Sequence, residues 1–245
     1  MTQRLGFVLI WSLSFVGPLP SAELTAVVNP RSAALSVLDG PSTCLTIGYY
    51  DWGPQWSEVR RDLSVTEQLD AAKFTFENTV TGTDDRYRVV GAWSSVDSRT
   101  VRLQANLQAT GDLDLTMAQF GFKPGAIFAG GELIATTRTG ATQTWRLPLG
   151  REPFKDAVVE IEVKHPDRDG FRLKFDRPTS INLDGEVRMV LSAGPVKRGT
   201  DVALGCVLEL PADTRFVAGP NRAGGVDDMD GWFPFAPPDP IPADS

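Results

Sequence analysis

Apolar and polar residues alternate along most of this chain, which is the pattern of half-buried β-strands. The clearest run extends from Val101 to Gln108, where every second residue is apolar. Other runs show the same period, with these apolar residues on one side: Val159, Ile161 and Val163; Phe171, Leu173 and Phe175; Val202, Leu204, Cys206, Leu208 and Leu210; Leu113, Leu115 and Met117; Phe74 and Phe76. The pattern predicts strands through most of the chain.

Clusters of glycine, proline and aspartate separate these runs at short intervals, as at Asp39-Gly40-Pro41 and Asp184-Gly185. Many short strands at such spacing indicate a sandwich or a barrel, here with roughly 12–14 strands. We predict an all-β fold over residues 23–217, a large antiparallel two-sheet β-sandwich of the jelly-roll or supersandwich kind. Two smaller sandwiches that meet near Gly140 are the alternative. The segment 57–68 fits a short helix or a strand.

The first 22 residues have the features of an export signal. Arg4 is basic, the run Leu5–Val16 is apolar, and Ser21 and Ala22 are small residues suited to a signal peptidase. The run is shorter than the about 20 apolar residues of a membrane-spanning helix. We therefore expect a signal peptide over 1–22, a secreted or periplasmic protein, and no membrane span after signal cleavage. An uncleaved N-terminal anchor is the alternative.

The C-terminal residues 218–245 differ in composition from the rest of the chain. They are rich in glycine, proline and aspartate, and the stretch from Val226 to Ser245 holds five aspartates and no lysine or arginine. Such a segment cannot bury enough apolar surface to fold alone. We expect an acidic tail or linker, beyond which another domain of a longer protein would begin. Trp232, Phe233 and Phe235 are candidate anchors against the β domain.

The charge of the chain disfavours nucleic acid as a partner. There are 24 lysine and arginine residues against 31 aspartate and glutamate residues, a net charge of -7, and no basic cluster that would neutralise phosphates. An anionic membrane surface is disfavoured for the same reason. Together with export, this favours an extracellular glycan or a separate catalytic domain as the partner.

Cys44 and Cys206 are the only cysteines. An oxidising compartment permits them to form a disulfide, which would tie an early strand to a late one. Two buried free thiols are the alternative. The sequence leaves both open, because a disulfide requires Cα atoms within roughly 7 Å of each other.

Aromatic side chains gather in the segment 49–56, beside a carboxylate and an amide. Sugar rings stack on aromatic planes, while polar groups bind their hydroxyls, so this composition is typical of a carbohydrate site. The predicted carbohydrate-binding residues are Tyr50, Asp51, Trp52, Trp56, Trp93 and Trp145. The alternative is that the same rings pack in the core, where each buries about 150–250 Å².

Glu160 and Glu162 alternate on one predicted strand. Their side chains would stand about 6.5–7 Å apart, within the range over which two carboxylates share glycoside hydrolysis. The segment 160–165 resembles part of the strand motif of laminarinase-like β-sandwich glycosidases, with Lys164 and His165 in place of the third acid. For an enzyme, this resemblance implies that Glu160 and Glu162 are catalytic. The alternative is an ordinary solvated strand face.

No cofactor is indicated by the sequence. His165 is the only histidine and precedes a proline, so we expect a turn residue rather than a catalytic or zinc-binding one. The run Asp167-Arg168-Asp169-Gly170 begins like a calcium loop but lacks the glutamate at the twelfth position. A tight hairpin is expected there, with Ca²⁺ as the alternative.

The strand pattern from Val27 to Pro211, with the stretch from Trp145 to Phe154, resembles the N-terminal β-sandwich accessory domains of secreted bacterial polysaccharide-degrading enzymes. This resemblance implies a non-catalytic module that binds carbohydrate or accompanies a catalytic domain. Two alternatives remain open. One is a glycoside hydrolase, or a polysaccharide lyase that uses Tyr50 with an arginine, acting on an extracellular glycan. The other is a structural envelope protein.

Overall fold

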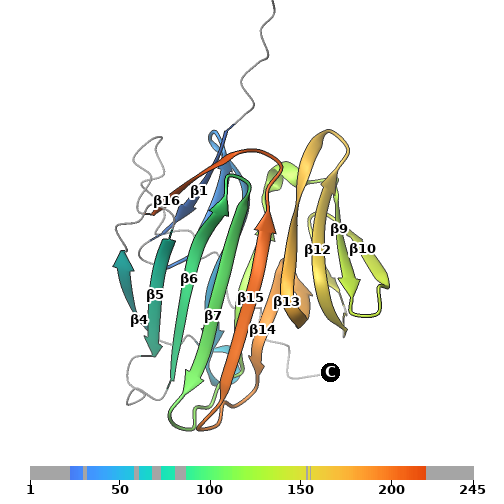
Figure 1. Cartoon of the computed structure of the whole chain (residues 1–245). Helices are drawn as coiled ribbons and strands as arrows, with labels where there is room; N and C mark the ends of the chain where they lie inside the picture. The colour runs from blue at the N-terminus through green and yellow to red at the C-terminus, as the bar shows by residue number, and fades with distance from the viewer. Residues whose placement is uncertain are drawn as a thin grey trace, which may run out of the picture.

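The structure, a computed structural model, describes residues 23–29, 32–57, 61–67, 73–80, 87–152, 154 and 156–218. The predicted signal peptide and the predicted tail beyond Ala218 lie outside these residues. The described chain forms strands and two short 3-10 helices, η1 (Pro54–Trp56) and η2 (Ala126–Phe128), which confirms the all-β class (Figure 1). The strands are β1 (Leu24–Val28), β2 (Leu35–Asp39), β3 (Ser42–Trp52), β4 (Arg61–Glu67), β5 (Lys73–Val80), β6 (Tyr87–Asp97), β7 (Thr100–Ala109), β8 (Met117–Pro124), β9 (Glu132–Thr137), β10 (Thr142–Arg146), β11 (Arg151–Glu152), β12 (Ala157–His165), β13 (Arg168–Asp184), β14 (Val187–Ala193), β15 (Asp201–Glu209) and β16 (Thr214–Ala218).

Backbone pairing joins these strands in one continuous path. Its order is β16-β1-β2-β3-β8-β14-β13-β15-β7-β6-β5-β4, with β12, β9 and β10 extending it from β13 and β11 pairing with the end of β13. Among the described pairs, β1 and β16 are parallel and the others are antiparallel. This mixed sheet bends over on itself into a nearly closed, barrel-like shape (Figure 1). The predicted division into two separate antiparallel sheets is therefore not confirmed.

The long strand β13 links the two halves of the path. Its first half, Arg172–Phe175, pairs with β15, whereas Ile181–Leu183 pairs with β14. On its other edge the register against β12 shifts between Val158 and Glu160, so that several residues of β13 bulge between the paired segments. A bulge bends a strand and increases its twist, and Pro178 within it has no N–H to donate to a ladder. Because of this bend, one strand pairs with β15 in one half of the sheet and with β14 in the other.

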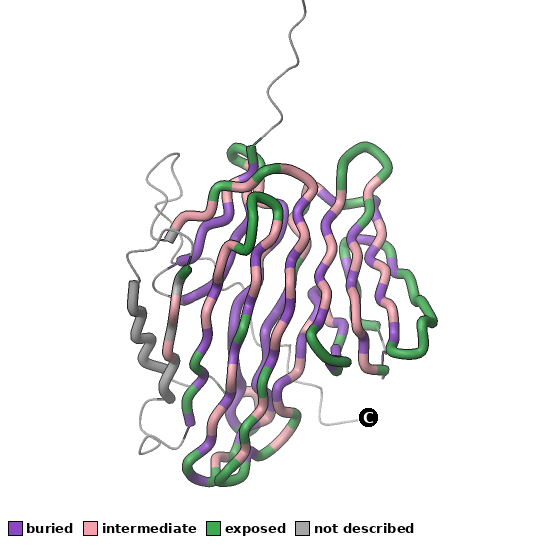
Figure 2. The backbone as a smooth tube through the Cα atoms, viewed as in Figure 1, coloured by how far each residue is buried: buried purple, intermediate pink, exposed green. Residues whose placement is uncertain are grey.

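The core lies between the two halves of the bent sheet. Buried side chains alternate with partly or fully exposed ones along the strands, as Figure 2 shows in purple, pink and green. One contiguous apolar cluster extends from Leu24 to Leu210 and includes residues from both sides of Gly140. The described strands therefore form one unit rather than the two small sandwiches considered as the alternative.

Several strand predictions are confirmed and others need correction. In β7, Val101, Leu103 and Leu107 are buried, as the alternation predicted. The bulge in β12 instead buries Val158 and leaves Val159 half-buried, so Val159 does not share the face of Ile161. The segment 57–68, where the sequence left helix or strand open, contains β4. The run through Leu113 is not one strand, because Leu113 forms an isolated bridge with Val196 before β8 begins.

Trp93 forms a hydrogen bond between two parts of the sheet that are distant in the strand order, β6 and the turn between β1 and β2. It lies on β6, is 1% exposed, and its indole Nε1 donates a hydrogen bond of 2.8 Å to the carbonyl of Ala33, in the turn between β1 and β2. A buried carbonyl that loses its donor costs about 1–3 kcal/mol. The bond therefore helps to close the sheet on itself.

We expect Trp93→Phe to lower the free energy of unfolding by about 2–3 kcal/mol, because it removes this donor and leaves a small cavity. The matched control is Trp52→Phe. The Trp52 indole N–H is buried without an acceptor in the described part of the chain, so this change should cost less than about 1.5 kcal/mol. Urea unfolding followed by circular dichroism measures both values. Equal losses would contradict the role given to the Trp93 bond.

Candidate functional site

Most of the aromatic residues predicted to bind carbohydrate are buried. The exposed fractions of Tyr50, Trp52, Trp93 and Trp145 are 3%, 8%, 1% and 8%. Trp93 and Trp145 belong to the main core, whereas Tyr50 and Trp52 form a separate cluster with Met117. The half-buried Trp56 packs edge-on against Trp52, with ring centroids 6.4 Å apart. The four buried rings present no open plane to solvent, so the predicted stacking surface is not formed by them.

Asp51 lies on the inner side of β3, in a buried polar network. The Tyr49 hydroxyl donates a hydrogen bond of 2.9 Å to Asp51 Oδ2 and also contacts the hydroxyl of Tyr87 on β6. Burial raises the pKa of Tyr87, which keeps its hydroxyl protonated. The network joins β3 to β6 across the core, so the structure gives Asp51 a place in the packing rather than on a ligand surface.

Tyr50 lies on the opposite side of β3, against a second buried polar group. Its hydroxyl donates a hydrogen bond to the carboxylate of Glu186, which is 2% exposed and accepts a second bond of 3.1 Å from Arg188 Nε. Burial raises the pKa of Tyr50, and the charge of Glu186 raises it further. A lyase base needs a tyrosine whose pKa is lowered. The arrangement therefore does not favour the lyase hypothesis, although it does bring Tyr50 beside an arginine.

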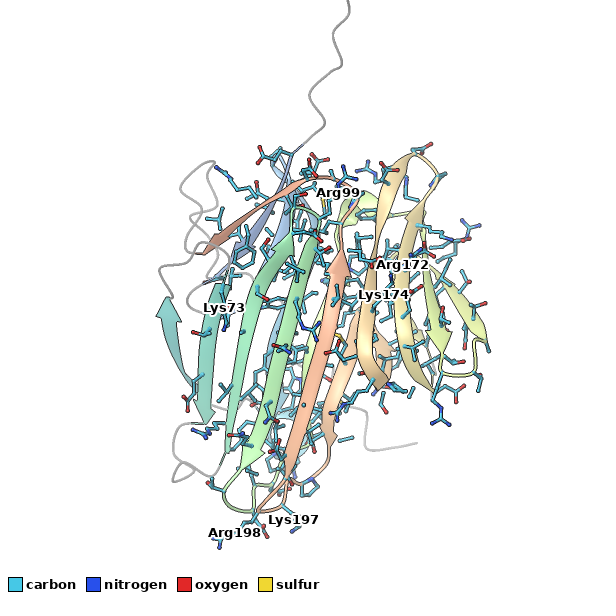
Figure 3. The ribbon with its side chains drawn as sticks, viewed as in Figure 1. Lys73, Arg99, Arg172, Lys174, Lys197 and Arg198 are labelled. Atoms are coloured by element: carbon cyan, nitrogen blue, oxygen red, sulfur yellow. The ribbon has the colours of Figure 1, made fainter. Side chains whose placement is uncertain are left out.

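Glu160 and Glu162 lie on the outward side of β12, in a ladder of ion pairs. Arg172 on β13 contacts both, with Nη2 3.0 Å from Glu162 Oε1 and Nε 3.4 Å from Glu160 Oε1. The ladder continues through Glu209, whose Oε1 lies 2.6 Å from Lys174 Nζ; Figure 3 labels Arg172 and Lys174. The carboxylates predicted as a catalytic pair are therefore neutralised by neighbouring cations.

The pKa of Glu162 is shifted in the direction opposite to that of a general acid. Burial alone would raise it, but hydrogen bonds and charges from Lys164 and Arg172 together hold the pKa of this carboxyl below its usual 4.5. A glycosidase acid must keep its proton near neutral pH, which requires a raised pKa. The structure thus favours the solvated, ion-paired strand face for these two residues.

His165 and the following acidic residues form the hairpin between β12 and β13. The imidazole Nδ1 of His165 accepts a hydrogen bond of 3.1 Å from the backbone N–H of Asp167. This places the histidine as a turn residue. In the described ranges, no three histidine, cysteine, aspartate or glutamate side chains gather as metal ligands.

Both cysteines carry free thiols in the structure. Cys44 lies on β3 and Cys206 on β15, and each is buried. Burial raises the pKa of the Cys44 thiol to about 11 and that of Cys206 to about 12. The disulfide considered from the sequence is therefore absent, and the alternative of two buried thiols is the one observed.

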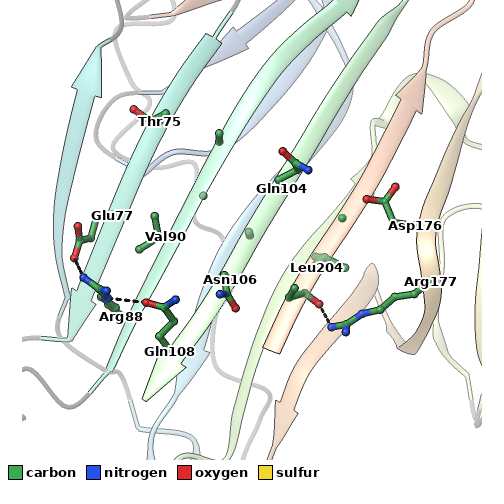
Figure 4. A pocket seen from close by; sticks show the side chains of 15 residues that line it. Thr75, Glu77, Arg88, Val90, Gln104, Asn106, Gln108, Asp176, Arg177 and Leu204 are labelled. Carbon is green, nitrogen blue, oxygen red and sulfur yellow. Dashed lines mark hydrogen bonds and ion pairs between the residues drawn. The ribbon is translucent and has the colours of Figure 1, made fainter. Parts of the chain in front are cut away.

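A groove of about 710 Å³ lies on the outward side of β5, β6, β7 and β15 (Figure 4). Its floor follows β7, where Gln104, Asn106 and Gln108 point outward at alternate positions. Strand geometry places successive members of this row about 7 Å apart. Small residues lie opposite Gln104, namely Ala92 on β6 and Gly205 on β15, whereas Val90 and Ala203 lie opposite Asn106. We call this hollow the β7 groove.

Charged side chains form two walls of the β7 groove. On one wall, Arg88 donates a hydrogen bond of 2.9 Å to Gln108 Oε1 and lies 3.5 Å from Glu77. On the other wall, Asp176 of the β13 bulge forms an ion pair of 2.5 Å with Arg102. Arg177, also from the bulge, donates a hydrogen bond to the carbonyl of Ala203 (Figure 4). Each wall therefore has its acid paired with a base.

One carboxamide on the floor is exposed to a ligand. Gln104 is exposed, and within the described part of the chain its side chain has no hydrogen-bond partner. Asn106 beside it is half-buried, and its Oδ1 is buried without a hydrogen-bond partner among the described residues. A carboxamide offers two donors and one acceptor oxygen. The groove thus presents a carboxamide between two walls whose acids are paired with arginines, which suits a hydroxyl-rich ligand.

The polar residues of the Val101–Gln108 alternation could have indicated this groove from the sequence, since three of them, Gln104, Asn106 and Gln108, form the row of amides on its floor. The sequence analysis considered aromatic residues instead. Two features of the groove could not be predicted from the sequence. One is the register that places Ala92 of β6 and Gly205 of β15 beside Gln104. The other is the bulge that brings Asp176 over Gly205.

Comparisons with known proteins leave the family of this chain open. Neither a protein-family model nor a curated protein matches it. Similar solved structures include a GalM/aldose epimerase homologue from C. elegans, with 7% identity and a TM-score of 0.42 over 77% of this chain and 98% of that chain. Another is the galactosidase domain of alpha-galactosidase-sucrose kinase, AgaSK, with 10% identity and a TM-score of 0.36 over 78% of this chain and 30% of that chain. Among the described residues, no helix has the length and apolar character needed to cross a membrane.

The Glu162 ion pairs give the stability of the fold a defined pH dependence. Because the folded-state pKa lies below 4.5, the pairs stabilise the protein above that pH, and this contribution is lost as the pH falls through the lowered value. We expect Glu162→Gln to cost about 0.5–1 kcal/mol at neutral pH and nothing once the carboxyl is protonated. Urea midpoints across the pH range measure this. Glu152→Gln on exposed β11 is the control, and a cost that stays constant in acid would contradict the assignment.

Proposed function

We propose that this protein is an exported, non-catalytic β-module that binds a neutral glycan in the β7 groove. The observation that carries the proposal is the row of carboxamides along β7, in which Gln104 is exposed between Ala92 and Gly205 and Asn106 is half-buried beside it. Hydroxyl groups of a sugar both donate and accept hydrogen bonds, as carboxamides do. Glu77 is paired with Arg88 and Asp176 with Arg102, so among the described residues of the two walls both carboxylates have a cationic partner, while Arg177 donates to the Ala203 carbonyl.

The open form of the groove supports recognition of an extended chain rather than a small metabolite. Its floor runs along β7 between the walls on β5–β6 and on the β13 bulge (Figure 4). The export signal predicted over 1–22 directs the module to extracellular polymers. Delivery of a separate catalytic domain to such a polymer is the role we propose for it.

An enzyme acting on the same glycan is the competing function. It would need a proton donor and a nucleophile or base near the ligand. Glu160 and Glu162 lie in the ion-pair ladder of β12 and β13, and neither is among the residues that line the β7 groove. Their pairing with Arg172 supports binding without turnover.

The test is a polysaccharide pull-down or glycan array with the mature protein, residues 23–245, followed by a reducing-end assay on each ligand found. We expect binding without new reducing ends. The double variant Gln104→Ala/Asn106→Ala should weaken binding about tenfold, because each lost hydrogen bond contributes about 0.5–1.5 kcal/mol. Gln143→Ala, an exposed glutamine on β10, is the matched control. New reducing ends, or equal binding by the double variant, would count against the proposal.

A second variant tests the shape of the groove separately from its hydrogen bonds. A methyl group at Gly205 would collide with the Asp176 carboxylate. We expect Gly205→Ala to push Asp176 away from Arg102 and into the groove, lowering affinity about threefold or more while the fold is retained. Ala203→Gly, on the same side of β15, is the control because it only widens the floor. Isothermal titration with the ligand from the pull-down measures both.

A further inference from the structure

Strand β10 forms an edge of the sheet at which the backbone is exposed. Among the described strands it pairs with β9 on one side and with none on the other, and Figure 1 shows it at the margin of the sheet. Thr142, Gln143, Thr144 and Arg146 are exposed, and only Trp145 of this strand turns into the core. Unpaired backbone groups on such an edge are a template for pairing with another strand.

The hydrogen bonds at the two ends of β10 show which of its backbone groups face β9. At one end the Ala141 carbonyl accepts a bond of 2.8 Å from the N–H of Thr137, and at the other the Leu147 N–H donates one of 3.0 Å to the carbonyl of Gly131. The register between these two bonds has no shift. Residues of an antiparallel strand point their backbone groups alternately to its two sides. The odd-numbered residues of β10 therefore bond to β9.

The even-numbered residues of β10 point their N–H and C=O groups away from β9. These residues are Thr142, Thr144 and Arg146, and successive members lie about 7 Å apart. In the part of the chain that the structure describes, no backbone bond reaches these groups. The edge thus offers three donors and three acceptors in one row.

The strand lacks the features by which exposed edges usually avoid pairing, which are proline, lysine and a bulge. Its sequence Thr-Gln-Thr-Trp-Arg contains no proline and no lysine, and it is not bulged against β9. Its one charge, Arg146, is the last residue, with Nη1 3.5 Å from the Gly130 carbonyl. Threonine and tryptophan also favour extended backbone. Nothing in the strand itself opposes the addition of a partner strand.

We infer that β10 pairs with β10 of a second copy of this chain, antiparallel, with Thr144 opposite Thr144 on a two-fold axis. In this register Thr142 lies opposite Arg146 of the second copy, and the three donors of each strand meet the three acceptors of the other. An isologous contact needs a patch that is complementary to itself. The outward row has this property because Thr144 is its centre.

The charges of the strand agree with a second copy as the occupant. The two-fold axis places the two Arg146 side chains at opposite ends of the paired strands, about 14 Å apart, which exceeds the Debye length of about 8 Å at physiological salt. By register, each Arg146 also lies beside Glu132 of its own β9. The copies therefore bring no like charges together, and opposed threonines are a favourable cross-strand pair.

The contact is small and leaves the β7 groove open. β10 supplies five residues, fewer than the roughly 20–30 residues a side of a stable interface, so we expect a weak dimer with a Kd of about 0.1 mM. Five strand spacings, about 24 Å along the sheet, separate β10 from β7. Two grooves on one polymer would bind more tightly than one through avidity. This consequence rests on the proposed function, whereas the dimer does not.

Sedimentation equilibrium of the mature protein, residues 23–245, at about 10 μM to 1 mM tests the inference without any glycan. We expect a reversible monomer–dimer equilibrium. Thr144→Pro should abolish it, because proline removes the central outward N–H while the bonds to β9 remain. Thr144→Val keeps this N–H and is the matched control, with the dimer retained.

Charged residues at position 144 test the register. Because residue 144 faces itself across the axis, Thr144→Lys and Thr144→Glu should each weaken association about tenfold or more. An equimolar mixture of these two variants should associate at least as strongly as the mature protein, and circular dichroism verifies that each is folded. A mature protein that stays monomeric, a dimer that persists in Thr144→Pro, or a mixture no stronger than its components overturns the inference. In the first case a different protein strand would have to be the occupant of the edge.

Discussion

The fold depends on one strand that hydrogen-bonds to different neighbours along its two halves. Residues Arg172–Phe175 of β13 pair with β15, and Ile181–Leu183 pair with β14. Buried backbone groups must be paired along their whole length, so the two halves of the sheet cannot separate without breaking the ladders of β13. The bulge that turns this strand also lifts Asp176 and Arg177 above β15, where they form a wall of the β7 groove. The same bend therefore closes the core and shapes the proposed binding site.

The outward side of β6 and β7 and the outward side of β3 and β8 differ because one carries polar side chains and the other carries large apolar ones. On the β7 side, carboxamides and paired charges are stable in contact with water, and Ala92 and Gly205 beside Gln104 are small enough to leave a hollow. On the β3–β8 side, Tyr50, Trp52 and Met117 form a buried cluster separate from the main core. Neighbouring strands of one sheet thus carry outward-facing residues of opposite polarity.

The sequence predicted the local structure better than the long-range arrangement. Alternation in Val101–Gln108 and Phe171–Phe175 identified β7 and part of β13, because period-2 burial is a local property of a strand. It did not reveal that β13 belongs to both halves, since that depends on which distant strands pair with it. Trp93 and Trp145 looked like ligand contacts by composition, but the register turns both rings into the core. The shift at Val158 likewise changed which valine is buried, and no local pattern marks it.

The two thiols give the molecule a property that its strand pairing alone would not reveal. Cys44 and Cys206 are buried on strands from different halves, each with a raised pKa that keeps the thiolate scarce. No covalent link holds these strands together, so every restraint between the two halves is non-covalent. The native state therefore requires no oxidant, and the same fold forms in a reducing or an oxidising environment.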